Sequence, residues 1–168
     1  MTTAFLDNST ICAISTPPGI GGVAIIRVSG NKAISICNNL INKSITNVKG
    51  YSVFYCTLSN NSAHVDDVVV TLYRAPQSYT GEDVIEISCH GSSYIQEKII
   101  NTLIQNGCSL AQPGEFSQRA FLNGKMDLSQ TEAIADLINS ESKKAHELAI
   151  NQMRGGFSSE IKNLRIEL

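Results

Sequence analysis

The residues with the most chemical potential lie in YTGEDVIEISCHG, residues 79–91, which holds three carboxylates and places Cys89 directly before His90. These residue types allow a thiol–imidazole catalytic pair, a metal site, or a strand that presents one polar group to a ligand. The β-branched run over 83–89 predicts a strand, whose side chains alternate between two faces. Cys89 and His90 then point in opposite directions, which excludes them as a nucleophile and its base.

Glu86 is the anomaly of this predicted strand. Ile85, Ile87 and Cys89 form an apolar face, whereas Glu86 lies on the other face, where an acid is stable only if it is exposed or paired. A carboxylate aimed into a pocket can accept two hydrogen bonds from a planar donor edge, such as the amino group and ring N–H of a pterin or purine. The alternatives are a solvated strand residue and a ligand-binding carboxylate.

The histidines form no metal-binding pattern. His64, His90 and His146 are scattered along the chain, without HxxxH or Cys/His spacing. His90, next to Gly91, is most simply a strand-end residue that is hydrogen-bonded to backbone. We therefore expect neither a metal site nor a catalytic residue in this chain.

Further candidate ligand groups lie outside this strand. TPPGIGGVAIIRVSG, residues 16–30, resembles a phosphate loop in its glycines. Because β-like sequence follows where such a loop needs a helix N-terminus, we reject nucleotide binding there. The glycines either connect two strands or keep the backbone open to a flat ligand. Arg27 interrupts AIIRVS as Glu86 interrupts its own strand, and Lys125 in NGKMD is by default a solvated turn lysine.

Composition excludes several classes of protein. With 168 residues, 42% hydrophobic and 17% charged, the chain is long enough for one globular domain with an appendage. A net charge of −2 gives no overall basic surface for nucleic acid. The N-terminus lacks a signal-peptide pattern, and no apolar run approaches a membrane span. Five cysteines without CxxC spacing indicate reduced, mostly buried thiols, so we expect a cytoplasmic protein without membrane contact.

Periodicity predicts the elements that position these groups. The expected strands cover residues 11–15, 22–29, 49–58, 66–74 and 83–89, with a loop over 59–63. The expected helices cover residues 31–42, 93–107, 114–122 and 129–154, with capping boxes at Ser93/Gln96 and Ser129/Glu132. The helical stripe resumes from Phe157 to Leu168, and such a stripe needs partner helices, which we expect beyond Leu168.

Four stretches together resemble the signature motifs of one family, the N-terminal part of the tRNA-modification GTPase TrmE/MnmE. They are Thr16 to Gly30, Thr80 to Gly91, Pro113 to Leu128, and Gln130 to Ile138. These motifs occur in order and at natural spacing, and the resemblance covers almost the whole chain. The departures from the family pattern affect local loop contacts and not the fold; they are Ser15, Ile20, Ser92 and Gln112.

The resemblance implies an α+β fold, in which a mixed or antiparallel sheet packs with helices as in the folate-binding part of aminomethyltransferases. It assigns residues 1–118 to a folate-binding and dimerisation domain, and residues 119–168 to the first helices of an incomplete helical domain. The family's GTPase domain, with its GTP, K⁺ and Mg²⁺, lies outside this chain, which has no GxxxxGK[ST]. We therefore expect this segment alone to be inactive.

The family's folate contacts match Arg27, Glu86 and Lys125. The implied ligand is 5-formyl- or 5,10-methylene-tetrahydrofolate. Glu86 suits the pterin amino and ring N–H edge, whereas Arg27 and Lys125 suit carbonyl and carboxylate acceptors. The resemblance further implies a homodimer through the N-terminal domain and an FAD-containing GidA/MnmG partner protein. With that partner, the intact family protein adds a carboxymethylaminomethyl-type group to the wobble uridine of tRNA.

Two alternatives use the same residues differently. In the first alternative, the chain is a free-standing folate-dependent aminomethyl- or formyltransferase-like protein. In the second, it is a dimerisation scaffold with a vestigial pocket. The transferase needs acid–base residues and a complete fold within this chain, and the unfinished helical stripe disfavours it. Folate titration separates the scaffold from a binding module, because a scaffold does not bind.

Overall fold

The structure is a computed structural model that describes residues 9–155. The chain divides into two compact units, Met1–Phe116 (unit 1) and Ser117–Leu168 (unit 2), each described here by itself. This division falls two residues before the boundary expected at residue 118. The assignment of the two parts to folate binding and to a helical domain stays a prediction.

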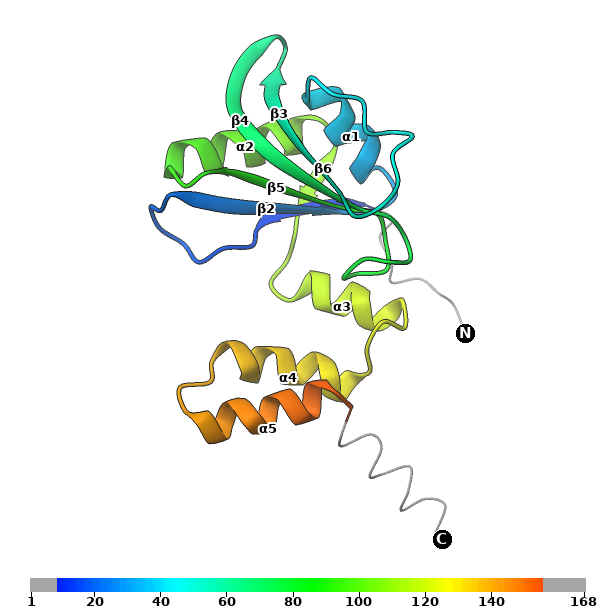
Figure 1. Ribbon diagram of the computed structural model, residues 1–168, viewed down its shortest axis with the longest axis vertical. Helices are drawn as coiled ribbons and strands as arrows, with labels where there is room; N and C mark the ends of the chain where they lie inside the picture. Colours follow the sequence, from blue (N-terminus) through cyan, green and yellow to red (C-terminus); the bar gives the residue numbers. More distant parts are fainter. Residues whose placement is uncertain (1–8, 156–168) are drawn as a thin grey trace, which may run out of the picture. The chain divides into compact units, whose positions relative to one another are not determined.

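The described part of unit 1 is built on one mixed sheet of six strands, in the order β3-β4-β5-β2-β1-β6 (Figure 1). The strands are β1 Thr10–Ile14, β2 Val23–Ser29, β3 Ser52–Asn60, β4 Ala63–Tyr73, β5 Val84–His90 and β6 Cys108–Leu110. Neighbouring strands are antiparallel, except that β1 and β6 are parallel. With its helices, this sheet confirms the α+β class.

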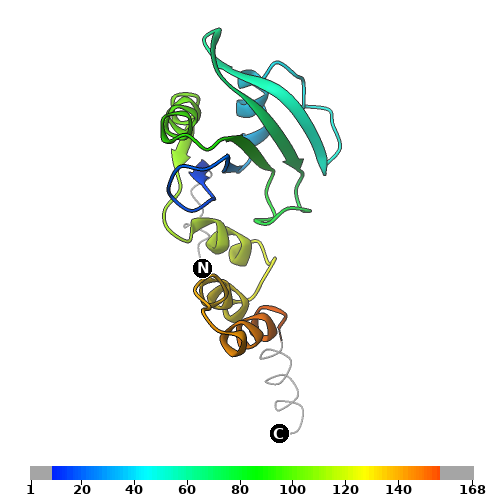
Figure 2. The same ribbon diagram turned by 60° about the vertical axis from the view of Figure 1, so that its left-hand side comes forward.

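Helices α1 and α2 cover one face of the sheet (Figure 1 and Figure 2). The helices are α1 Ala33–Leu40, α2 Ser93–Gln105, α3 Glu115–Leu122, α4 Leu128–Ile138 and α5 Lys143–Met153. Every second residue of the central strands enters the core beneath α1 and α2, as β4 shows with Val68, Val70 and Leu72. The opposite, outward face therefore carries the residues in between, which include Arg27 of β2 and Glu86 of β5.

The strands depart from the expected pattern in two places. β3 and β4 are joined by a tight turn at Asn61 and Ser62, whose φ angles are 48° and 66°, and not by a loop over 59–63. β4 consequently begins at Ala63 and not at 66. Strand β6 was not expected, because its three residues carry no alternation and are held by parallel pairing with β1.

The helix boundaries correct both expected capping boxes. The box of α4 uses Asp127, whose side chain accepts from the backbone N–H of Gln130, and not Ser129 with Glu132. Helix α2 follows Ser92 and has no side-chain capping bond. The expected helix 129–154 is two helices, because the chain leaves α4 at Asn139 and starts α5 after its N-cap, Ser142. The stripe expected over 157–168 lies outside the described residues.

The glycine-rich loop between β1 and β2 is fastened to the end of β5. The backbone N–H of Gly21 donates to the carbonyl of Gly91 at 3.1 Å. The side-chain amide of the buried Gln96 donates to the carbonyls of Gly19 and Gly91, at 3.2 and 3.1 Å. A Cβ on Gly91 would stand 2.3 Å from the carbonyl oxygen of Gly21, so the close approach of loop and strand requires glycine at this position.

Within residues 9–155, we find no helix that is both long and apolar enough to cross a membrane.

Candidate ligand-binding site

An ion pair between neighbouring strands forms the centre of the candidate site. Arg27 of β2 lies directly opposite Glu86 of β5 in the antiparallel register. The Nε and Nη2 atoms of Arg27 both donate to Oε1 of Glu86, at 3.0 and 2.8 Å. The two side chains are about one-quarter exposed, at 24% and 22%. The residues that interrupt two apolar strands are thus brought together at one place on the outward face.

Aromatic rings border this pair. The guanidinium carbon of Arg27 lies 5.0 Å from the ring centroid of Tyr79 and 5.5 Å from that of Phe116. Rings at this distance attract the cation and restrict its rotation. Tyr79 lies in the loop before β5, and Phe116 is the last residue of unit 1. Both are distant from Arg27 in the sequence, so the sequence pattern alone did not associate them with it.

Tyr73 of β4 completes the surroundings of Glu86. Its hydroxyl donates to Oε2 of Glu86 at 3.4 Å, and its ring makes an edge-to-face contact with Tyr51 at 5.8 Å. Burial, followed by the Glu86 carboxylate, raises the pKa of Tyr73 above its ordinary value. Glu86 is therefore a paired carboxylate whose Oε1 is occupied by Arg27 and whose Oε2 accepts one long hydrogen bond.

Lys125 belongs to unit 2, where it follows α3. Its backbone N–H donates to the carbonyl of Ala120 at 2.8 Å, and Gly124 before it has a φ of 69°. The side chain is exposed. Its role as a folate contact stays a prediction from the family resemblance.

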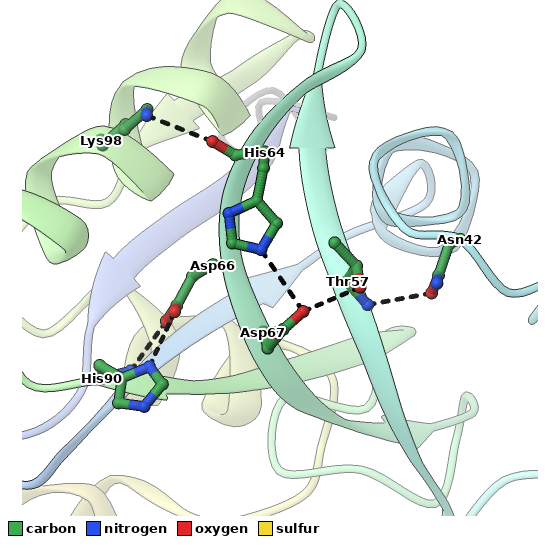
Figure 3. Close-up of polar contacts among 7 residues, drawn as sticks. All are labelled: Asn42, Thr57, His64, Asp66, Asp67, His90 and Lys98. Atoms are coloured by element: carbon green, nitrogen blue, oxygen red, sulfur yellow. Dashed lines mark hydrogen bonds and ion pairs between the residues drawn. The ribbon is translucent and has the colours of Figure 1, made fainter.

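His90 has a different environment from the one expected. Its ring Nδ1 lies 2.7 Å from Oδ1 of Asp66, and its backbone N–H donates to Oδ2 of the same carboxylate at 2.9 Å (Figure 3). The ring thus bonds to a carboxylate and not to backbone. Asp66 precedes the apolar run of β4, and no sequence spacing linked it to His90. Because a carboxylate only accepts, Nδ1 must carry the hydrogen.

A second carboxylate, Asp67, lies next in the chain (Figure 3). Its Oδ1 accepts from the Thr57 hydroxyl at 2.8 Å and lies 3.5 Å from Nε2 of His64. The Thr57 hydroxyl, and then His64, hold the pKa of Asp67 below its ordinary value. Across residues 9–155, no three His, Cys, Asp or Glu side chains are arranged to hold a metal ion.

Cys89 points away from His90, as strand alternation predicts. Its side chain enters the core, and its Sγ lies 3.5 Å from the carbonyl of Ala24. Burial, followed by the negative charge of Asp66, raises the pKa of the Cys89 thiol to about 11. The structure therefore separates the thiol from the imidazole and removes them as a catalytic pair.

We expect Cys89 to react slowly with a thiol reagent in the native protein. At pH 8 little of its thiol is ionised, since the thiolate is the reactive form and its pKa is raised to about 11. The labelling rate, followed by mass spectrometry of peptides, should still be rising at pH 10, where an exposed thiol has levelled off. Fast, selective labelling of Cys89 at pH 8 would restore the catalytic-cysteine interpretation.

A separate cavity of about 350 Å³ lies between the turn of β3 and β4 and helix α2. Its lining is largely polar and includes Asn60, Lys98 and Asn101. Neither Arg27 nor Glu86 lines it. The cavity and the ion pair are thus different features of unit 1, and no sequence pattern indicated the cavity.

The described part of unit 1 is an α+β domain. Its mixed sheet has helices on one face, and on the other face it has a charged pair among aromatic rings. The family model described as "GTP-binding protein TrmE N-terminus" matches residues 10–125. The chain therefore belongs to this family of TrmE N-terminal segments, as its motifs indicate.

Similar curated proteins carry a name consistent with this family. The chain is 54% identical over 166 residues to the tRNA modification GTPase MnmE of Parabacteroides distasonis, covering 95% of this chain and 36% of the relative. It is 50% identical to the MnmE protein of Flavobacterium johnsoniae and 52% identical to that of Bacteroides thetaiotaomicron, with 97% of this chain and 36% of each relative covered. The chain thus spans about a third of the length of these relatives.

Proposed function

We propose that this chain is the folate-binding and dimerising module of a tRNA-modification GTPase. The observation that carries the proposal is the Arg27–Glu86 pair, which lies on the outward sheet face beside Tyr73, Tyr79 and Phe116. Both members of the pair occupy positions where the family contacts folate. The cofactor is a tetrahydrofolate derivative, either the 5-formyl or the 5,10-methylene form.

The pair has the hydrogen-bonding groups that a pterin edge requires. Among residues 9–155, Oε2 of Glu86 accepts the long bond from Tyr73, which leaves it capacity for one N–H of the pterin edge. Arg27 uses two of its five N–H donors on Glu86, which leaves donors for a carbonyl oxygen. The family resemblance adds Lys125 as a contact for a carbonyl or carboxylate of the ligand. The ion pair also holds both side chains in place before the ligand arrives, which reduces the entropy lost on binding.

The dimer contact of this proposal uses unit 1. Tyr51, Val53 and Tyr55 expose 68%, 62% and 65% of their surface at and beside β3. Large apolar side chains gathered on one surface are typical of an interaction site. A second copy of this chain is the partner that the family resemblance implies.

The wider activity belongs to the whole protein. In it, an inserted GTPase domain binds GTP with K⁺ and Mg²⁺, and an FAD-containing GidA/MnmG protein is the partner. Together they add a carboxymethylaminomethyl-type group to the wobble uridine of tRNA in the cytoplasm, with the folate as source of the one-carbon unit. The names of the relatives, which are tRNA modification GTPases, support this context.

Isothermal titration with 5-formyl- and 5,10-methylene-tetrahydrofolate tests folate binding by this chain. Saturable binding of either form supports the binding module. Absence of binding to both forms contradicts it and leaves the dimerisation scaffold. Transfer of the one-carbon group from the folate to an acceptor amine by the chain alone would instead support a free-standing transferase.

We expect the chain to sediment as a homodimer at tens of micromolar. The expected mass is about twice the 18.1 kDa of one chain, because the exposed apolar residues of β3 are then covered. Sedimentation velocity measures this directly. A single species of one-chain mass at these concentrations would refute dimerisation by this segment.

We expect no GTP hydrolysis by this segment. The sequence has no GxxxxGK[ST] loop, and phosphoryl transfer in this class of GTPase needs that loop with its lysine and Mg²⁺-binding hydroxyl. Phosphate release by the purified chain should equal the background without protein. Saturable turnover would overturn the assignment of the GTPase domain to the rest of the protein.

A further inference from the structure

Two polar groups share the outward row of β5. Glu86 and His90 are four residues apart on the same strand, and strand alternation puts both on the row opposite Ile85, Ile87 and Cys89. Four residues of strand correspond to about 13 Å. A ligand that lies along β5 with one end at Glu86 therefore reaches His90 only with a part well removed from that end.

The surface between these groups suits a flat ring. Ser88 lies midway, and its cross-strand neighbours are Ile25 on β2 and Val69 on β4. A small side chain between two β-branched apolar ones forms a low platform. Val23 lies opposite His90 and is 64% exposed, which extends the apolar strip to the imidazole.

The imidazole is positioned by a buried group. The side chain of Asp66 is 7% exposed, and both of its oxygens bond to His90. The hydrogen bond from the backbone N–H of His90 to Asp66 already joins β5 to β4. The second bond, between Nδ1 of His90 and Asp66, therefore orients the imidazole ring. The His90 side chain is 66% exposed, and its Nε2 has no hydrogen-bond partner among residues 9–155.

We propose that His90 binds the glutamyl end of the folate whose pterin edge lies at Glu86. This rests on the proposed function. The pterin takes the Arg27–Glu86 pair, the benzoyl ring lies over Ser88, and Nε2 of His90 makes a hydrogen bond to the amide–carboxylate tail. Asp66 is a positioning residue, since it holds the ring and does not reach the ligand. His90 thereby distinguishes glutamylated folates from the pteroate core.

The test compares two ligands on this chain, 5-formyl-tetrahydrofolate and 5-formyl-tetrahydropteroate, which lacks the glutamate. One hydrogen bond predicts that the parent binds the first about tenfold more tightly than the second. His90→Asn keeps a donor near the position of Nδ1 for Asp66 and removes Nε2. It should reduce the preference to about twofold or less, while the affinity for the pteroate form stays unchanged. His64→Asn is the matched control, because His64 is 61% exposed and also lies beside an aspartate, and it should keep the parent's preference.

A second measurement needs no variant. The chain has three histidines, so their ring protons are separable by NMR, and only His90 should shift between the two ligand complexes. Equal shifts, or a His90→Asn variant that keeps the tenfold preference, overturn the proposal. A parent that binds both ligands equally refutes the role of His90 and leaves folate binding intact. A parent that binds neither refutes both.

Discussion

Replacing Glu86 with glutamine is expected to weaken binding of 5-formyl-tetrahydrofolate by roughly thirty- to a thousandfold, or about 2–4 kcal/mol. Glutamine keeps the shape but removes the charge that strengthens hydrogen bonding to the pterin edge. It also turns one acceptor into an NH₂ donor that faces a donor of the ligand. Isothermal titration of the variant against the parent measures the loss.

The fold should survive this change at a small cost. Glu86 also accepts from Arg27, and the amide oxygen of glutamine can accept in its place, so we expect a loss of about 1 kcal/mol or less in the free energy of unfolding. Asp83→Asn is the control: Asp83 accepts from the backbone N–H of Ala75 at 2.9 Å, which asparagine can also do. If Glu86→Gln binds as tightly as the parent, Glu86 is a structural strand residue.

Replacing Gly91 with alanine is expected to destabilise the fold by about 2–4 kcal/mol. The added Cβ would meet the carbonyl oxygen and carbon of Gly21 at 2.3 and 2.7 Å. Both are backbone atoms, so the glycine-rich loop must move and loosen its bonds to Gly91 and Gln96. Urea unfolding followed by circular dichroism gives the change in midpoint.

Gly22→Ala, in the same loop, is the matched control for Gly91→Ala. No heavy atom lies within 4 Å of a Cβ on Gly22, and its φ is outside the left-handed region. We expect its stability to change by less than about 1 kcal/mol. If Gly91→Ala lowers the free energy of unfolding by as little as Gly22→Ala, the loop tolerates displacement and its attachment to β5 contributes little to stability.

Elements with a strong period were predictable, and those held by tertiary contacts were not. The alternation of Ile85, Ile87 and Cys89 predicted the buried face of β5, because strand geometry alone determines it. Strand β6 depends on its pairing with β1, which three residues cannot signal. The break between α4 and α5 was hidden because Ser142, its N-cap, lies inside a stripe whose apolar spacing continues.

The candidate site was predictable as a set of residue types and not as an arrangement. Arg27 and Glu86 each interrupt an apolar strand, which marked them before any contact was known. Their pairing depends on which strands are neighbours, and β2 and β5 are separated by two other strands in the chain. Asp66 was missed for the same reason, since its bond to His90 crosses from β4 to β5.

The register between β2 and β5 has a consequence for folding. Arg27 and Glu86 are 59 positions apart in the chain, and a slip of one residue would turn one of them toward the core. A ligand that bridges the pair therefore recognises the assembled sheet and neither strand alone. By mass action, such a ligand would stabilise only molecules in which β2 and β5 have paired in the correct register.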